Sequence, residues 1–479
     1  MIVRAPWLAV SLAVAACSVG LHYTRPSPST PAAWSELPAG RLVTDPAALA
    51  RWWTGFHDPT LDALVGRAVD GNLDLKIAAA RLKEARAARG IAAAGALPQV
   101  DAAASYSRTQ RSNSVPPFNA AAGAPSPFGP RVQNAFEAGF DATWEIDVFG
   151  GVRRDLEAAS AQVEAAAEAR RDVLVSAIAE VARNYVELRG NQRRLEILED
   201  TLRSERDTLD LARSRFDAGL GSELDVTRAE GLLQETASRG PELERLARAD
   251  VQALRVLLGG EPGALAPALE APGAIPPIPP EIPWALPSEL LSRRPDLRQA
   301  EREVAAATAR VGVATADLFP RFSITGGLSR LSTDLGGLTS GASQLWALGP
   351  RVSWPIFSGG RIRANIRVQE ARQEQALLQY EKAVLVAVEE VENALSAHVR
   401  ERRRQEDLGA SVAANRRALE LATDRYTGGL ESFLSVLDAQ RALYAAEDLL
   451  VQSESAAALD LIAVYKALGG GWETSDAGG

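Results

Sequence analysis

The sequence predicts a mainly α-helical chain with a small β part, built as two tandem structural repeats. Two stretches without proline, 151–218 and 361–427, are each long enough for one helix of about 100 Å at 1.5 Å per residue. Short segments in which large and small side chains alternate, as they do in strands, precede each stretch. The same helix–glycine turn–helix phrase also occurs twice, as RFDAGLGSELDVTRAEGLL around Phe216 and as RYTGGLESFLSVLDAQRALY around Tyr426.

The N-terminal sequence MIVRAPWLAVSLAVAACSVG has the pattern of a signal peptide, with one arginine and an apolar run that ends at Ala16. This run is too short to span a bilayer as a helix. The residues before Cys17, the only cysteine of the chain, resemble the lipobox of bacterial lipoproteins. We therefore predict that residues 1–16 are removed and that Cys17 carries a lipid anchor such as palmitate; Ser18 after it favours the outer membrane. The alternative is an ordinary signal peptide with an incidental cysteine.

The rest of the chain is expected to contain two repeats joined by a linker. Two more pairs of phrases support the repeat: ALPQVDAAASYS with LFPRFSITGGLS, and WEIDVFGGVRRDLEAA with WPIFSGGRIRANIRVQ. A stretch rich in proline and glycine lies between the repeats and cannot form a continuous helix. The predicted organisation is signal peptide 1–16, lipid-anchored tether 17–60, first repeat 61–259, linker 260–287, second repeat 288–468 and C-terminal tail 469–479.

Within each repeat we expect a short helix, a β-hairpin, a long helix, a tip turn and a second short helix. Two short helices laid end to end match one long helix, which predicts a helical-barrel wall of uniform height. Glycines suit the tip turns because they tolerate positive φ; they are Gly219 and Gly221 in the first repeat and Gly428 and Gly429 in the second. The short helices are expected near 61–94, 222–258, 288–318 and 431–468.

Residues in both long helices recur every seven positions in a mainly apolar series, which predicts left-handed packing against neighbouring helices. The pattern by itself fits a structural coiled coil equally well. The first series is Leu174, Val181, Leu188, Leu195, Leu202, Leu209 and Phe216, and the second is Leu377, Val384, Val391, His398, Gln405, Val412, Leu419 and Tyr426.

The alternating segments predict two β-hairpins, with four strands in all. Four strands cannot close a barrel, and an open sheet edge cannot lie in lipid. A sheet that crosses a membrane would therefore need strands from several chains. The alternative is a pair of hairpins that pack on each other in water, with Phe140, Trp144 and Trp354 in their core.

Composition and motifs argue against an enzyme and against a nucleic-acid-binding protein. The formal net charge is −9, and no basic stripe is present to neutralise phosphates. His22, His57 and His398 have no metal-ligand spacing and the chain has no phosphate-binding loop, so we predict no cofactor and no metal. His398 lies in the heptad series and is expected to pack there. The run 293–296 is expected to begin a helix, with its aspartate paired to a nearby arginine.

Several phrases together resemble TolC-like outer-membrane efflux channels, in particular their lipoprotein (OprM- and NodT-like) class. The resemblance covers nearly all of the mature chain and implies a homotrimer, with twelve strands in one membrane β-barrel and a helical tunnel across the periplasm. It also implies a passive exit duct for drugs and small molecules, held in outer-membrane lipid. The implied partners are a periplasmic adaptor (membrane fusion) protein and an inner-membrane RND-type transporter. The phrases are LPSELLSRRPDLRQAERE, FPRFSITGG, PIFSGGRIRANI, VLDAQRALYAAEDLL and YKALGGGW.

The resemblance further implies a periplasmic gate at the helical tips. Leu434 and Asp438 match the positions of an apolar and an acidic constriction. Tyr426 and Asp225 match positions that link neighbouring hairpins in the closed state, and the glycine turns match the tips where an adaptor docks. A ring of three carboxylates would attract cations and repel anions. From the residues alone, Leu434 could instead be a helix-core residue and Asp438 part of a solvated face.

The chain departs from some members of that class at two tip positions. Some relatives carry a second aspartate where this chain has Ser435, and a basic residue where it has Glu431. The salt links of those relatives are therefore not carried over. Two other functions stay open: the duct of a type I protein-secretion system, and a lipid-anchored periplasmic coiled-coil scaffold without a pore.

Overall fold

The computed structural model describes residues 19–29, 31–35, 49–110, 112, 132–279 and 290–473. It divides into two compact units. The first holds Lys83–Glu164 and Arg302–Leu378 with the N-terminal segment up to Arg25, and the second holds Pro26–Leu82, Ala165–Glu301 and Gln379–Gly479. Each unit thus draws on both repeats. The predicted signal peptide, Cys17 and the end of the predicted linker lie outside the described residues.

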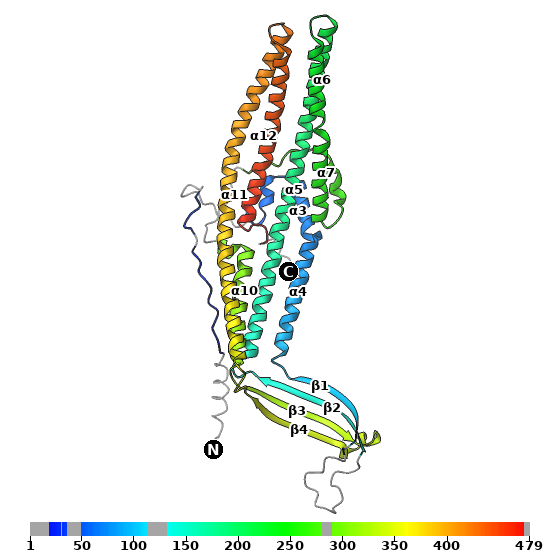
Figure 1. Ribbon diagram of the computed structural model, residues 1–479, viewed down its shortest axis with the longest axis vertical. Coiled ribbons are helices and arrows are strands. Elements are labelled where there is room, and N and C mark those ends of the chain that lie inside the picture. Colours follow the sequence, from blue (N-terminus) through cyan, green and yellow to red (C-terminus); the bar gives the residue numbers. More distant parts are fainter. Residues whose placement is uncertain are drawn as a thin grey trace, which may run out of the picture. The chain divides into compact units, whose positions relative to one another are not determined.

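Two long helices confirm the prediction drawn from the absence of proline. Helix α5 (Gly151–Asp217) and helix α11 (Arg361–Thr427) each run for 67 residues without a break (Figure 1). The shorter α-helices are α3 (Pro59–Gly71), α4 (Leu73–Ala94), α6 (Glu223–Ala237), α7 (Gly240–Leu257), α8 (Ala266–Glu270), α9 (Leu290–Arg293), α10 (Pro295–Ala316) and α12 (Phe433–Ala467). Short 3-10 helices are η1 (Trp52–Phe56), η2 (Gly263–Leu265), η4 (Gly336–Thr339) and η5 (Gly341–Ser343).

The first repeat breaks two helices that the sequence suggested would be continuous. Asn72, which is 2% exposed, ends α3 and starts α4, because its Oδ1 accepts from the backbone N–H groups of Asp74 and Leu75. Its Nδ2 donates to the carbonyl of Leu257, which ties the break to the end of α7. Pro241 near the start of α7 lacks the N–H that a continuous α6–α7 helix would use. The second repeat has neither device after its tip, and α12 is one helix.

The predicted hairpins form one antiparallel sheet with strand order β1-β2-β3-β4. Its strands are β1 (Gln99–Gln110), β2 (Val132–Ile146), β3 (Arg321–Ser332) and β4 (Gln344–Ser353). The two hairpins join edge to edge through β2 and β3, where Phe140 pairs with Leu328. The alternative of a core between the hairpins is wrong for this chain, since Phe140 is 58% exposed and Trp354 is 57% exposed.

Equivalent tryptophans brace the sheet in the two repeats. The indole Nε1 of Trp144 donates to the carbonyl of Ala96 after α4, at 3.0 Å. The indole Nε1 of Trp354 donates to the carbonyl of Leu318 after α10, also at 3.0 Å. The repeated phrases therefore build the same strand-to-helix connection twice. In the part of the chain that the structure describes, none of the helices has the length and apolar character needed to cross a membrane.

The heptad series forms much of the core of the second unit. Val181 and Leu188 of α5 and Val391 of α11 are fully buried, and His398 is 6% exposed, as expected for a packed residue. Burial lowers the pKa of His398, which favours its neutral form. Phe216 is the exception, because it is 43% exposed at the end of α5.

Part of the predicted tether also belongs to this core. Trp52 and Phe56 of η1 are 2% and 0% exposed. The Trp52 ring stacks on Tyr465 of α12, with ring centroids 5.0 Å apart. This piece of the chain is therefore packed against the last helix.

Candidate functional site: the helical tips

The two tip turns have the same backbone. In the first, Leu220 N–H donates to the Arg215 carbonyl at 2.8 Å and Gly219 N–H donates to the Phe216 carbonyl at 2.9 Å. The second turn repeats both bonds, from Leu430 to Arg425 at 2.8 Å and from Gly429 to Tyr426 at 3.0 Å. This is the Schellman arrangement, which needs a left-handed residue just after the helix.

Only two of the four predicted turn glycines supply that conformation. Gly219 has φ 73° and Gly429 has φ 70°. At Gly221 the space is tight instead, because a Cβ there would lie 3.2 Å from the backbone nitrogen of Phe216. Gly428 meets ordinary contact distances and has no positive φ. The turns therefore depend most on Gly219 and Gly429.

The helices that leave the two turns start differently. Asp225 closes a capping box at the start of α6: its Oδ2 accepts from the Ser222 hydroxyl at 2.9 Å, and its own N–H donates back to that hydroxyl at 3.3 Å. At the start of α12, the Glu431 carboxylate accepts from the Ser435 hydroxyl at 3.0 Å and lies 3.6 Å from Arg425. The Ser435 hydrogen bond is the main reason that the pKa of Glu431 is lowered. Ser435 and Glu431, where the chain departs from some members of the class that it resembles, thus contact each other.

Leu434 and Asp438 lie one turn apart on the outward face of α12. Leu434 is 43% exposed and Asp438 is also exposed, whereas the intervening Val436 and Leu437 are 2% exposed. The interpretation of Leu434 as a helix-core residue is therefore wrong for the single chain. Both side chains can therefore contact solvent or a neighbouring molecule at this surface.

An apolar cluster joins the two hairpins of the chain just below the turns. Tyr426 packs on Phe433 with ring centroids 5.1 Å apart, and the Arg215 guanidinium carbon lies 4.7 Å from the Tyr426 ring centroid. Arg215 Nη1 also donates to the Thr427 carbonyl at 3.2 Å, so a residue of the first hairpin holds the second. The cluster consists of Leu209, Ala212, Ala229, Leu232, Tyr426, Phe433, Val436 and Leu437.

A polar layer on the same helices has one contact within the first hairpin and one between the two hairpins. Glu205 of α5 is 3% exposed, and its Oε1 accepts from the Thr236 hydroxyl of α6 at 2.9 Å. Gln440 of α12 is 4% exposed, and its Nε2 donates to the Thr208 hydroxyl at 2.7 Å. Glu205 Oε2 and Gln440 Oε1 have no hydrogen-bond partner among the described residues. Burial raises the pKa of Glu205 to about 7, so this layer holds a carboxyl that is largely neutral below that pH.

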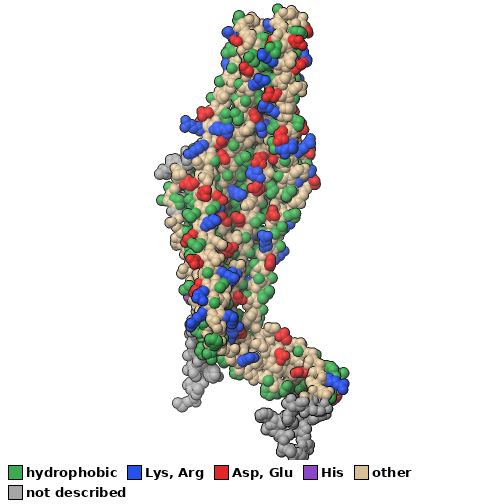
Figure 2. All heavy atoms as spheres, in the orientation of Figure 1, with side chains coloured by type: hydrophobic (Ala, Val, Ile, Leu, Met, Phe, Trp, Pro, Cys, Tyr) green, Lys and Arg blue, Asp and Glu red, His purple; other side chains and the backbone are tan. Residues whose placement is uncertain are grey.

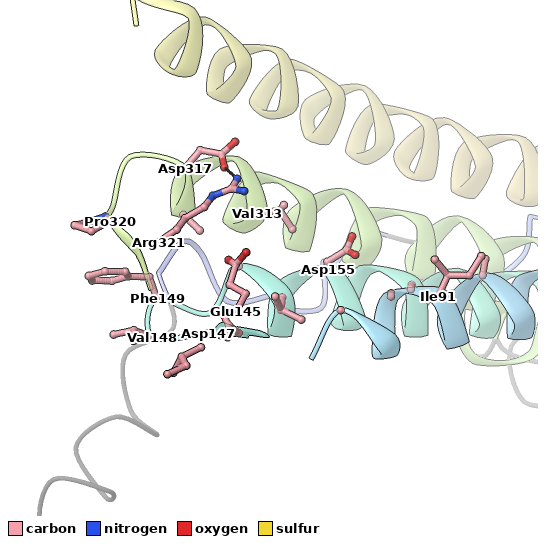
Figure 3. Close-up of a pocket in the computed structure, with 18 residues that line it drawn as sticks. Ile91, Glu145, Asp147, Val148, Phe149, Asp155, Val313, Asp317, Pro320 and Arg321 are labelled. Atoms are coloured by element: carbon pink, nitrogen blue, oxygen red, sulfur yellow. Dashed lines mark hydrogen bonds and ion pairs between the residues drawn. The ribbon is translucent and has the colours of Figure 1, made fainter. Parts of the chain in front are cut away.

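The first unit contains a separate cavity of about 420 Å³ where helices meet the sheet (Figure 3). Its charged lining includes Glu145, Asp155 and Asp317, and Arg321 is paired with Asp317 at 2.5 Å. Among the residues that the structure describes, no group of three or more histidine, cysteine or acidic side chains is placed to hold a metal ion. On the face drawn in Figure 2, basic and acidic side chains are mixed along the helices.

A family model described as "Outer membrane efflux protein" matches residues 64–260 and 286–470, one block on each repeat. The chain belongs to the outer membrane efflux protein family. It is 33% identical over 473 residues to the solvent efflux pump outer membrane protein SrpC of Pseudomonas putida, covering 97% of each chain. It is 33% identical over 467 residues to the outer membrane protein OprJ of Pseudomonas aeruginosa, covering 97% of this chain and 95% of that one.

Solved structures agree with this assignment. The outer-membrane channel OprN superposes with a TM-score of 0.85 at 37% identity, covering 95% of this chain and 100% of that one. The open state of the MtrE outer membrane channel of Neisseria gonorrhoeae gives a TM-score of 0.82 at 29% identity, covering 95% and 99%. This chain is thus an outer-membrane efflux channel, as its resemblance predicted, and its family is a transport family.

Sequence reasoning on this efflux channel singled out Tyr426 but missed Arg215, its partner in the other hairpin. The available signal was an arginine directly before the aromatic residue in both tip phrases, Arg215–Phe216 and Arg425–Tyr426. The phrases look alike, but Arg215 lies over the Tyr426 ring whereas Arg425 pairs with Glu431. The shared arginine–aromatic pattern therefore identifies the tip position but does not predict which residue the arginine contacts.

A double-mutant cycle on Arg215→Ala and Tyr426→Leu is expected to give a coupling energy of about 1 kcal/mol, because a guanidinium on an aromatic face contributes about that much. The measurement is urea unfolding of both single variants and the double variant. The matched cycle with Arg425→Ala should show a markedly smaller coupling to Tyr426. Equal coupling in the two cycles would contradict the assignment of Arg215 as the contact between hairpins.

Proposed function

We propose that the chain is the exit duct of a tripartite efflux pump and that it works as a homotrimer. The observation that carries the proposal is the sheet. Among the described strands, β1 and β4 each pair on one side only, and the sheet exposes large apolar side chains such as Val100, Leu328 and Trp346. In lipid, such edges need partners because backbone groups there cannot bond to water. Three chains would supply twelve strands for one closed β-barrel.

The partners of the duct follow from the class of its relatives. SrpC and OprJ are outer membrane proteins, and SrpC is named as part of a solvent efflux pump. We expect a periplasmic adaptor to dock at the glycine turns and an inner-membrane RND-type transporter to supply the energy and the substrates. A lipid on Cys17 would anchor the mature chain in the outer membrane.

The gate of the duct is proposed to lie at Leu434 and Asp438. Both side chains are exposed in the single chain, one turn apart on α12. Three copies around an axis would place an apolar ring next to an acidic ring. The apolar ring would close the tunnel by packing and loss of water, and the acidic ring would favour cations over anions. Tyr426 would hold the two hairpins of one chain together through the apolar cluster described above. Asp225, whose capping box lies within its own hairpin, would link neighbouring hairpins of the closed trimer.

Single-channel conductance in a planar bilayer tests the proposal. The double variant Leu434→Ala with Asp438→Ala is expected to conduct at least about twofold more than the native channel and to prefer cations less, because the narrowest rings lose bulk and charge. Leu449→Ala is the matched control, since Leu449 is similarly exposed, at 41%, farther along α12. Unchanged conductance in an assembled double variant would reject the gate. Absence of conductance in any folded form would favour the scaffold without a pore.

A further inference from the structure

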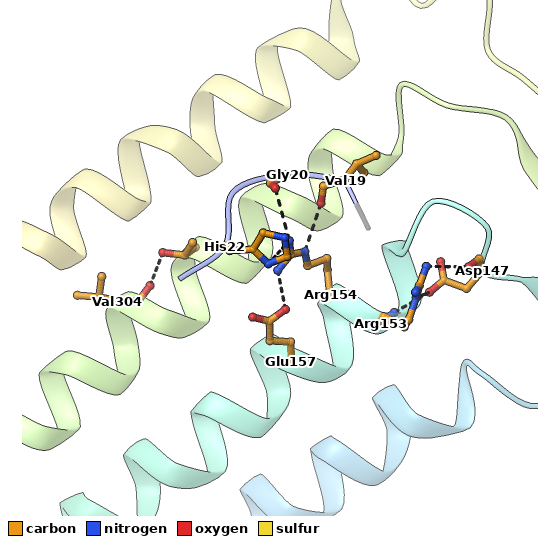
Figure 4. Close-up of polar contacts among 9 residues, drawn as sticks. Val19, Gly20, His22, Asp147, Arg153, Arg154, Glu157 and Val304 are labelled. Atoms are coloured by element: carbon orange, nitrogen blue, oxygen red, sulfur yellow. Dashed lines mark hydrogen bonds and ion pairs between the residues drawn. The ribbon is translucent and has the colours of Figure 1, made fainter. Parts of the chain in front are cut away.

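The first described residues of the chain lie in a fitted site on the first unit. Val19 N–H donates to the carbonyl of Phe149 at 3.1 Å, in the short connection between β2 and α5. The segment then passes beside α10 and α5 (Figure 4). Tyr23 packs on an alanine cluster, and the Arg302 guanidinium carbon lies 5.4 Å from its ring centroid. The cluster is Ala161, Ala305 and Ala306.

Arg154 of α5 is the centre of this site. It is 2% exposed, and all three guanidinium nitrogens are engaged. Nε donates to the Val19 carbonyl at 3.2 Å, and Nη2 donates to the Gly20 carbonyl at 3.4 Å. Nη2 also lies 3.3 Å from His22 Nδ1; since a guanidinium only donates, His22 must accept there (Figure 4). Among the described residues, the carboxylate paired with Arg154 is that of Glu157, one turn along its own helix, at 2.8 Å.

Two glycines give the site its shape. Gly20 has φ 95°, and a Cβ on it would lie 2.6 Å from the Cα of Gly312 on α10. A Cβ on Gly312 would in turn lie 3.0 Å from both Cγ and Cδ of Arg154. The segment can therefore approach α10 only as glycine against glycine, and the space left by Gly312 is filled by the arginine stem. Burial of an arginine has a desolvation cost in free energy, and its hydrogen bonds to backbone carbonyls offset that cost.

We propose that Arg154, Gly312 and the alanine cluster form a binding site for the mature N-terminal segment, residues 19–23, and that this site fixes where the anchor of the chain leaves the protein. Val19 is two residues after Cys17, so the bound segment begins next to the predicted anchor in the sequence. Residues 19–23, which we call the strap, are bound beside the connection between β2 and α5 and do not form a free tether. The role of the strap in placing the anchor rests on the proposed lipidation of Cys17. The binding of the strap itself rests on the contacts of Arg154.

A spin label on the strap tests the proposal. Leu21, 60% exposed, is replaced by cysteine in the full-length protein, which is then processed, purified and reconstituted in phospholipid vesicles. The electron paramagnetic resonance spectrum is expected to show an immobilised label in the otherwise native background. Arg154→Ala is expected to raise the mobile fraction by at least about tenfold, because hydrogen bonds from a charged donor are lost. Arg89→Ala is the matched control, since Arg89 donates to Ser160 on α5 and should leave the spectrum unchanged.

Each outcome bears on the strap separately from the anchor. A mobile label in the native background, or an immobilised label in a folded Arg154→Ala variant, overturns the site. If Arg154→Ala does not fold, Arg154→Lys serves instead. It should still raise the mobile fraction, because one ammonium cannot reach all three acceptors on the strap, the carbonyls of Val19 and Gly20 and His22 Nδ1. Labelling stoichiometry reports on Cys17, since an acylated Cys17 leaves one thiol per chain and a free Cys17 leaves two. Two labels with an immobilised position 21 would reject the lipid anchor and keep the strap.

Discussion

Replacing Arg294 by alanine is expected to lower the free energy of unfolding by about 1.5–3 kcal/mol, the range for lost hydrogen bonds to charged groups, because the arginine is buried but its carboxylate partners are partly exposed. Arg294 is 8% exposed at the start of α10. Its Nη2 lies 2.7 Å from Asp296 Oδ2, its Nη1 lies 2.7 Å from Glu390 Oε2, and Nη1 also donates to the Ala467 carbonyl at 3.0 Å. One guanidinium therefore joins the start of α10, the middle of α11 and the end of α12.

A nearby carboxyl increases the expected loss. Burial raises the pKa of Asp172, and the positive charge of Arg294 offsets part of that rise. Without the arginine, Asp172, Asp296 and Glu390 would repel one another, and Lys466 would be the positive charge left to offset this repulsion at Asp172. The measurement is urea unfolding followed by far-ultraviolet circular dichroism. The control is Arg248→Ala, whose exposed partner Glu244 lies 3.7 Å away and which should cost at most about 0.5 kcal/mol. Similar losses for both variants would show that Arg294 does not join the helices.

Replacing Glu205 by glutamine is expected to remove a pH dependence of stability at the tips. The pKa of Glu205 is raised from 4.5 to about 7 by burial. Between these values the folded state keeps a proton that the unfolded state has lost, so folding stability falls as pH rises. The loss is complete above pH 7 and amounts to roughly 3 kcal/mol at about 1.4 kcal/mol per pKa unit. Glutamine imitates the neutral acid and keeps an oxygen to accept from Thr236.

Unfolding free energies at pH 5 and pH 8 check this prediction. The groups that face Glu205 are Glu235, which raises its pKa, and Arg239 and Arg441, which lower it. The native protein should lose more stability between the two pH values than the variant does, by up to about 3 kcal/mol. Glu230→Gln is the control, because Glu230 is an exposed partner of Arg213 and should leave the pH difference unchanged. An identical pH difference in native protein and Glu205→Gln would contradict the assignment.

The sequence predicts those parts of the fold that depend on local chemistry. The absence of proline predicted that α5 and α11 are unbroken, glycines marked their ends, and residue alternation located all four strands. How the two hairpins pair was not predictable, because the β2–β3 register joins residues nearly two hundred positions apart, such as Phe140 and Leu328. The same holds for Arg215 and Arg154, since nothing local distinguishes an arginine that binds a distant segment from one that faces water. The positions of the tip residues could be predicted from the family resemblance, but their contacts could not.

The paired turns have a consequence for how such a channel can change over generations. Each turn is held by two main-chain bonds and a single left-handed glycine, so its shape depends on almost no other side chain. Phe216 and Tyr426, in equivalent places, already differ in exposure, and Asp225 and Ser435 already differ in their bonds. Each repeat is therefore free to acquire its own recognition surface while the backbone that presents it stays constant.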